Sequence, residues 1–283
     1  MTLPDLILSS RINQNGLFSE IDSANLCLDL AHFKSYPHAI TYNYNSRGFR
    51  DQEWPIGLAE LKDAVWCIGD SFTVGLGSPI AHTWVTRLAA RSGRRIINVS
   101  MDGASNEWIA RRAQAVATAV NPGNLVIMWS YVHRREHKNH LLSDEHRRLP
   151  NVKSTVVQDW ENLLECKRQV DQTDANVVHL AVPNAITEFC PLYHQLVWNQ
   201  ICGPDWPSLA PRSLNELAQL PDYIISEITH LHKCLDTIQL NIEMNTKLGL
   251  FCQVKRLDLA RDGHHFDLIT ADWAASYVAN LLK

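Results

Sequence analysis

Residues 64–77 read Ala-Val-Trp-Cys-Ile-Gly-Asp-Ser-Phe-Thr-Val-Gly-Leu-Gly. The first five residues are apolar, and such a short run predicts a buried strand over 64–68. Glycine and polar residues follow directly, and they predict a tight turn at the carboxyl end of that strand. A buried strand that ends in a polar, glycine-rich turn is typical of α/β proteins, which place their ligands at this position.

On the C-terminal side of this stretch, short apolar runs alternate with longer amphipathic segments. We expect helices over 78–92, 106–120 and 156–170, the first with Ser78 as its N-cap and Pro79 at its first position. Further strands are expected over 95–99, 124–129, 176–182 and 250–254, and a closing helix over 268–282. Strands separated by helices imply parallel βαβ units. The predicted fold is therefore α/β, with a doubly wound, flavodoxin-like parallel sheet of about five strands flanked by helices.

The chain of 283 residues is long enough for one large domain over 1–283, with two additions. Residues 1–60 show little periodicity and are expected to form an N-terminal extension of strands and loops. Residues 184–249 are interpreted as an insertion between the fourth and fifth strands. This insertion would consist of an irregular segment over 184–215 and a long helix over 221–249.

Composition narrows the class of protein. A content of 46% apolar and 20% charged residues is ordinary for a globular protein, and a net charge of −4 speaks against a nucleic-acid partner. The seven cysteines are scattered without a Cys-x-x-Cys pair, which favours free thiols in a reducing compartment. Neither a signal peptide nor an apolar run long enough to cross a membrane is evident, so we expect a cytoplasmic location. Composition does not predict an oligomeric state.

Polar residues follow the predicted strands at the edge where ligands bind. Because the carboxyl ends of parallel strands meet at one edge, these residues should converge there. A serine hydroxyl becomes a useful nucleophile when a histidine takes its proton, and a carboxylate on the other ring nitrogen fixes the tautomer. The pattern therefore predicts a site for acyl transfer. The residues concerned are Asp70, Ser71, Gly103, Asn106, Ser130, Tyr131, His133, Arg134, Asp262, His264 and His265.

Three of these stretches resemble a known family. Gly69-Asp-Ser-Phe72, with Gly75 and Gly77 behind it, resembles the first signature block of the SGNH (GDSL-like) hydrolases. The glycine at 103 resembles the second block, and Asp262-Gly-His-His265 resembles the closing Asp-x-x-His block. Residues 45–51, Asn-Ser-Arg-Gly-Phe-Arg-Asp, resemble a segment that precedes the nucleophile in some branches. The resemblance covers residues 40–130 and 250–283 and leaves the middle of the chain unmatched.

The resemblance implies a role for each matched residue. Ser71 would be the nucleophile, His265 the base and Asp262 the group that orients the base. The backbone N–H groups of Ser71 and Gly103 would stabilise the oxyanion. Five further residues are expected to contact the substrate: Asp70, Asn106, Tyr131, Arg134 and His264.

One block departs from the family pattern. The third block normally supplies an asparagine to the oxyanion hole, whereas residues 129–134 read Trp-Ser-Tyr-Val-His-Arg. Ser130 or His133 is a candidate replacement donor, and Tyr131 and Arg134 are further ones. Alternatively, the hole has two backbone donors only.

Other interpretations of the same residues stay open. Asp70 or Ser71 could cap a helix, and Asp262-Gly263 could be a plain turn. Residues 133–137 match the His-x-x-Glu-His zinc pattern but are read as a solvated polar loop, so no metal or cofactor is expected. Three tryptophans could either stack on a sugar ring or pack in the core, and three residues before the first strand could either tie a loop or contact substrate. The tryptophans are Trp84, Trp198 and Trp206, and the other three are Asn45, Arg47 and Arg50.

These observations predict a serine esterase that acts on a small acyl ester, an O-acyl group on a carbohydrate being one candidate. An O-acyltransferase that uses the same acyl-serine intermediate is an alternative. A non-catalytic binding protein on a degenerate hydrolase fold is another, although the retained serine, acid and histidine speak against it.

Overall fold

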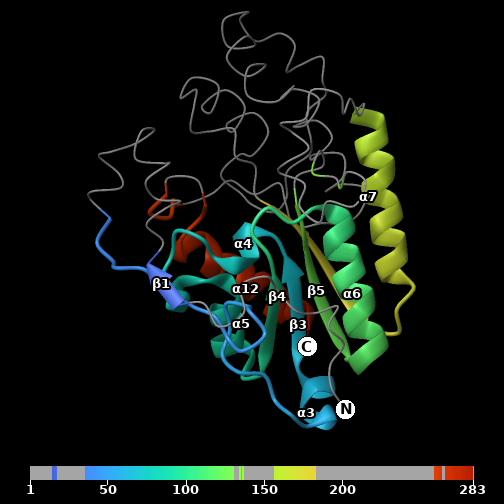
Figure 1. The fold of residues 1–283 in the computed structure, drawn as a ribbon, viewed down its shortest axis with the longest axis horizontal. Coiled ribbons are helices and arrows are strands. Elements are labelled where there is room, and N and C mark those ends of the chain that lie inside the picture. The colour runs from blue at the N-terminus through green and yellow to red at the C-terminus, as the bar shows by residue number, and fades with distance from the viewer. Residues whose placement is uncertain are drawn as a thin grey trace, which may run out of the picture.

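A four-stranded parallel sheet forms the centre of the molecule (Figure 1). The computed structural model describes residues 15–17, 36–130, 134, 136, 156–182, 258–262 and 265–282. The strands are β3 (Val65–Gly69), β4 (Ile96–Ser100), β5 (Asn124–Trp129) and β6 (Asn176–Ala181), in the spatial order β4-β3-β5-β6. This is the order of a flavodoxin-like, doubly wound sheet, as the sequence predicts. The chain enters in the middle at β3, moves outward to β4, and then crosses to β5 and β6.

The strands are apolar because both faces of the sheet are covered. Every residue of β3 and β4 is buried, which explains why these strands lack the alternating pattern of a half-exposed sheet. Trp66 of β3 and Trp129 of β5 are fully buried and belong to the hydrophobic core. The register pairs Val65 with Ile96 on one side and with Asn124 on the other.

Helices lie on both faces of the sheet. The helices α5 (Trp84–Ser92) and α12 (Leu268–Leu281) pack together on one face, and α6 (Asn106–Val120) and α7 (Val156–Asp171) pack on the other (Figure 1). Arg87 of α5 donates to Asp272 of α12 over 2.8 Å. Two short helices, α3 (Leu58–Asp63) and α4 (Ser71–Val74), flank β3 in the chain.

The helix predicted over 78–92 begins later than expected. Residues Ile80–His82 form a single 3₁₀ turn, η2, and α5 starts at Trp84 with Thr83 as its N-cap, whose side chain accepts from the Thr86 N–H. Ser78 does not cap the helix, because its hydroxyl donates to the backbone oxygen of Phe266 over 3.3 Å. A contact with a distant part of the chain therefore overrides the local capping preference.

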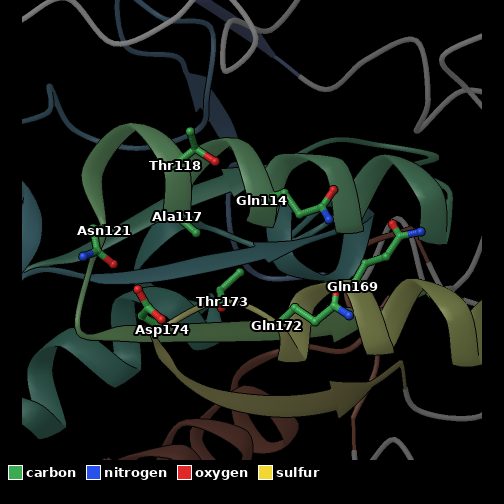
Figure 2. Close-up of a pocket in the computed structure, with 8 residues that line it drawn as sticks. All are labelled: Gln114, Ala117, Thr118, Asn121, Gln169, Gln172, Thr173 and Asp174. Carbon is green, nitrogen blue, oxygen red and sulfur yellow. The ribbon is translucent and has the colours of Figure 1, made fainter.

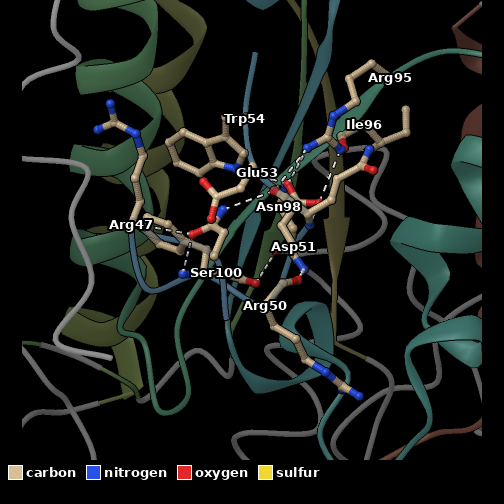
Figure 3. Close-up of polar contacts among 12 residues, drawn as sticks. Arg47, Arg50, Asp51, Glu53, Trp54, Arg95, Ile96, Asn98 and Ser100 are labelled. Carbon is tan, nitrogen blue, oxygen red and sulfur yellow. Dashed lines mark hydrogen bonds and ion pairs between the residues drawn. The ribbon is translucent and has the colours of Figure 1, made fainter. Parts of the chain in front are cut away.

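The N-terminal extension contributes a two-stranded antiparallel sheet and a tied loop. Strand β1 (Asn15–Leu17) pairs with β2 (Thr41–Asn43). In the loop that follows, the Asn45 side chain accepts from two backbone N–H groups, so this asparagine ties the loop. Asp51 then binds Arg95 over 3.0 Å and accepts from the Asn98 N–H over 3.1 Å (Figure 3). Burial raises the pKa of Asp51, and the Arg95 guanidinium opposes that rise. These bonds fasten the extension to β4.

Several sequence predictions fall outside the described residues. They are the strand over 250–254, the insertion over 184–249 with Trp198 and Trp206, and the His-x-x-Glu-His stretch over 133–137 apart from Arg134 and Glu136. Trp84 is described and is fully buried in the core, so it packs rather than lining a pocket. Among the described cysteines, Cys67 and Cys166 are buried free thiols. Within the described ranges, no helix combines the length and apolarity needed to cross a membrane.

The tautomer of one partly buried histidine, His179, is fixed by its hydrogen-bond partners. The Trp129 indole N–H donates to Nδ1 of His179 over 3.1 Å, and Nε2 of His179 lies 2.8 Å from an oxygen of Asp171. An indole nitrogen can only donate, so Nδ1 must be the acceptor and Nε2 must carry the proton. His179 is therefore neutral in this arrangement. Burial lowers its pKa, although the hydrogen bond to Asp171 opposes that change.

This histidine should make the protein less stable as the pH falls from 7 to 5. An unfolded histidine takes up a proton near pH 6.5, whereas the folded His179 does so at a lower pH. Between those two values the unfolded state binds more protons, so the free energy of unfolding rises with pH in that window. Urea unfolding of the wild type and of His179→Gln at pH 7, 6 and 5 measures the effect. The variant should show a shallower pH dependence; equal slopes would contradict the assignment.

Candidate active site

Ser71 lies at the carboxyl end of β3, as the first residue of α4. Asp70 is the N-cap of this helix, and its side chain accepts from the Phe72 N–H over 3.1 Å. Of the two capping possibilities, the structure therefore selects Asp70. Gly75 ends the helix in the left-handed conformation, with a φ of 74°, and donates its N–H to the backbone oxygen of Ser71. The sequence Asp-Ser-Phe-Thr-Val-Gly thus encodes a single capped turn that begins with the serine.

The turn after β4 lies beside this helix. Gly103 has a φ of 70°, which favours glycine, and the N–H of Ala104 closes the turn on the backbone oxygen of Met101. The Met101 N–H donates to the backbone oxygen of Gly69 over 3.2 Å, directly before Asp70. The two predicted oxyanion turns are therefore joined through the ends of their strands. The chain reverses its direction of travel across the sheet at β3, where ligands bind in doubly wound folds.

Asp262 and His265 form a buried acid–base pair. One carboxylate oxygen of Asp262 lies 2.5 Å from Nδ1 of His265, and the other accepts the backbone N–H of His265 over 2.9 Å. Both residues are less than a tenth exposed. The carboxylate therefore fixes the imidazole through Nδ1 and directs Nε2 away from the acid. Asp262 does more than start a turn, because its carboxylate also holds the histidine.

The segment that carries this pair packs against the turn after Ser71, although the two are almost 200 positions apart. The ring of Phe72 lies 4.6 Å from the ring of His265, measured between centroids. The Arg261 N–H donates to the backbone oxygen of Gly77 over 2.8 Å. A β-carbon on Gly77 would lie only 2.8 Å from Cγ of Asp262. The second glycine of Gly-Leu-Gly is thus needed for close approach to the acid, a role that its sequence spacing alone did not indicate.

A second polar network surrounds Asp70. The Ser130 hydroxyl donates to Asp70 over 2.6 Å, and Nη1 of Arg134 lies 3.2 Å from the same carboxylate oxygen. Burial raises the pKa of Asp70, and the positive charge of Arg134 is the strongest opposing influence. Both side chains of this ion pair are buried. The network therefore links the segment after β5 to the N-cap of the serine helix.

Asn106 extends this network to α6. Its side-chain oxygen accepts the Ser130 N–H over 2.9 Å, and its own backbone N–H donates to the backbone oxygen of Arg134 over 3.3 Å. Three residues expected to contact substrate are thus tied into one network with Ser130, namely Asp70, Asn106 and Arg134. Contact of these three with substrate stays a prediction. Tyr131, His133 and His264 lie outside the described residues.

An open polar groove of about 620 Å³ lies between α6 and α7 (Figure 2). Its lining residues are Gln114, Ala117, Thr118, Asn121, Gln169, Gln172, Thr173 and Asp174. Asn121 directly follows α6 and Thr173 precedes β6, so the groove lies at the amino ends of the strands. It is at the opposite edge of the sheet from Ser71 and plays no part in the candidate site. The described residues contain no cluster of three side chains suited to a metal ion.

Comparison with known proteins gives structural neighbours only. No protein-family model and no curated protein matches the chain. A solved structure named TesA is 15% identical over 78% of this chain and 98% of its own, with a TM-score of 0.44. A lipolytic protein of the G-D-S-L family from Desulfitobacterium hafniense is 13% identical over 77% and 99%, with a TM-score of 0.45. A lipase/acylhydrolase from Enterococcus faecalis is 14% identical over 77% and 94%, with a TM-score of 0.39. Solved structures of GDSL-type proteins are thus among those that the chain resembles.

Proposed function

We propose that this chain is a serine ester hydrolase of the SGNH type, with Ser71 as nucleophile, His265 as base and Asp262 as the residue that orients the base. The main support is the buried Asp262–His265 pair, with its 2.5 Å contact, packed through Phe72 against the helix that starts at Ser71. An acid–histidine pair beside a serine is the arrangement that acyl transfer requires.

The reaction proceeds in two steps. Nε2 of His265 takes the proton of the Ser71 hydroxyl as the serine oxygen attacks the ester carbonyl. The tetrahedral intermediate collapses, the histidine returns the proton to the leaving alcohol, and an acyl-serine remains. Water then attacks the acyl-serine with the same histidine as base, and the acid product leaves. Asp262 keeps the proton of the imidazole on Nδ1 and stabilises the charged ring in both steps.

The oxyanion of each intermediate would be held by the backbone N–H groups of Ser71 and Gly103. Preorganised donors of this kind are each worth about 3–4 kcal/mol of barrier. We leave Ser130 out of the hole, because its hydroxyl proton is directed at Asp70. The proposed oxyanion hole therefore has two backbone donors, and His133 stays the candidate for a third donor.

The proposed substrate is a small acyl ester, with an O-acyl group on a carbohydrate as the class to examine first. The buried position of Ser71 fits a compact reacting group. An O-acyltransferase would pass the same acyl-serine to a sugar hydroxyl, and a binding protein on this fold would form no acyl-serine.

Hydrolysis of p-nitrophenyl acetate tests the proposal directly. The wild type should release p-nitrophenol with turnover, and Ser71→Ala should not. Ser276→Ala is a matched control, because this serine lies on α12 and its hydroxyl donates to the Asp272 backbone oxygen of the same helix over 2.7 Å. Release that persists in Ser71→Ala would remove the serine mechanism. Analysis of products in the presence of a sugar acceptor separates hydrolysis from acyl transfer.

Replacing Gly77 by alanine should lower kcat by about 100-fold, the loss expected when a catalytic group is displaced by about 1 Å. The glycine has a φ of 75°, and its added β-carbon would meet Asp262 at 2.8 Å. The clash should push the acid out of line with His265 while KM stays nearly constant. Gly93→Ala is the control, since that glycine also has a positive φ, but among the described residues beyond its chain neighbours no atom lies within 4 Å of the added carbon. An equal loss of activity in both variants would contradict this reason.

A further inference from the structure

Arg50 lies before β3 in the chain, yet its guanidinium reaches the turn that follows Ser71. Nη1 donates to the backbone oxygens of Val74, over 3.2 Å, and of Gly75, and Nη2 donates to that of Ser78 over 2.7 Å. The side chain points away from the neighbouring Asp51–Arg95 ion pair (Figure 3). The Arg50 side chain therefore binds the serine turn, whereas its backbone oxygen accepts from the Asn98 side chain of β4 over 3.4 Å.

The environment of this guanidinium is unusual for a residue that only stabilises a fold. Arg50 is 3% exposed, and burial lowers its pKa. Within the described residues no carboxylate is paired with it; three backbone oxygens hold it, and the Tyr42 ring lies 4.2 Å from the guanidinium carbon. Burying a cation without a counter-ion is costly, and apolar packing would stabilise the same space at least as well. The arrangement indicates that the position of the bound turn matters.

The three carbonyl groups belong to the turn that positions two parts of the proposed site, the nucleophile Ser71 and the acid Asp262. Val74 and Gly75 end α4, which has only four residues, so holding its last carbonyls also fixes the start of the helix at Ser71. The third carbonyl, on Ser78, follows Gly77, the glycine that packs against Asp262. The Tyr42 ring supports the same turn, because its hydroxyl accepts the Gly77 N–H over 2.7 Å.

We infer that Arg50 is a positioning residue for the proposed reaction: one buried guanidinium holds the serine helix and the acid-supporting glycine in fixed relative positions. This inference rests on the proposed function. It also gives residues 45–51 a role. Asn45 ties this loop, and Arg50, near the end of the loop, holds the turn that supports the proposed site. The sequence left open whether Arg50 ties a loop or contacts substrate. In this inference Arg50 acts on the site by holding the serine turn, without touching substrate.

Steady-state kinetics of Arg50→Met and Arg50→Lys test this inference. Arg50→Met keeps the apolar stem and removes every donor, so kcat per active molecule should fall about 10- to 100-fold with KM within about threefold. Arg50→Lys should recover only part of that loss, because its compact ammonium group keeps the charge but lacks the span of the guanidinium, whose Nη1 and Nη2 donate to separate carbonyls. A fluorophosphonate titration counts the active molecules in each sample, so that a partly unfolded sample does not imitate a catalytic defect.

Arg95→Met is the matched control. The Arg95 side chain anchors the same extension through Asp51 and Gln52, and its other hydrogen bond among the described residues goes to the Ile96 backbone oxygen rather than to the serine turn. This variant should lose stability and keep its kcat. A wild-type kcat per active molecule in Arg50→Met, or an equal loss in Arg95→Met, would overturn the inference while the proposed function stands. If Arg50→Met does not fold, an unchanged kcat in Arg50→Lys overturns it. A wild type that neither hydrolyses ester nor takes up the fluorophosphonate would overturn the proposed function, and this inference with it.

Discussion

Replacing Asp262 by asparagine should lower kcat/KM for ester hydrolysis about 10⁴-fold, the loss expected when the orienting acid of such a triad becomes an amide. The carboxylate of Asp262 accepts from Nδ1 of His265 over 2.5 Å. An amide N–H in the same place would donate to Nδ1 and force the ring proton onto Nε2. The histidine could then no longer take the proton of Ser71, and the charged ring would lose its counter-ion.

The same fold supplies a matched control for this substitution. Asp267 lies five residues further on, is also buried, and binds Nδ1 of His82 over 2.9 Å and the Tyr36 hydroxyl over 2.6 Å. Asp267 and His82 form another aspartate–histidine pair, and neither residue belongs to the proposed triad. Asp267→Asn should therefore keep kcat/KM within a few-fold of wild type. If both asparagine variants lost activity equally, the effect of Asp262→Asn would come from packing rather than from the tautomer.

Replacing Arg134 by methionine should destabilise the protein by about 3–5 kcal/mol, the range seen when one partner of a buried ion pair is removed. Asp70 is fully buried and would keep its charge without the guanidinium that now lies 3.2 Å away. Removing Arg134 should raise the pKa of Asp70 further above its usual range. Since a raised folded-state pKa favours the protonated folded form, the stability deficit of the variant should shrink as the pH falls.

The double variant Asp70→Asn with Arg134→Met isolates this interaction. The amide oxygen can still accept from the Phe72 N–H, and the amide NH₂ can donate to the Ser130 hydroxyl oxygen, so no charge is left buried. The double variant should be more stable than Arg134→Met alone, with a coupling free energy of about 2 kcal/mol or more in urea unfolding. Additive losses would show that Asp70 and Arg134 contribute independently.

The positions of the four described strands in the chain could be predicted from sequence because their burial is so complete. β3 and β4 are buried throughout, so their apolar runs stand out against the amphipathic helices. The bounds of α6 and β5 agree with prediction, since Ser105 caps one and a Gly123 turn precedes the other. The start of α5 differs from the prediction. The Ser78 hydroxyl, expected to cap this helix, donates instead to the backbone oxygen of Phe266, and no local sequence pattern indicates that partner.

For the candidate site too, one part could be predicted from the sequence and another part could not. Short motifs pointed to Ser71, Asp262 and His265, because acyl transfer needs those side chains in a fixed chemical relation. The supporting contacts were not predictable: the packing of Gly77 against Asp262 and the grip of Arg50 on three carbonyls join positions far apart in the chain. Arg134 was expected at the substrate, and its described charge contact is with Asp70. When a buried polar group binds a partner far away in the chain, that partner can be identified only from the structure.

Labelling with a fluorophosphonate, followed by peptide mapping, tests the central claim most directly, because such a probe reacts with a serine only when a base has activated it. The account predicts one adduct per chain, on Ser71, absent from Ser71→Ala and formed much more slowly in Asp262→Asn. A folded wild-type protein that takes up no label, or that carries the label on a different residue, would contradict it.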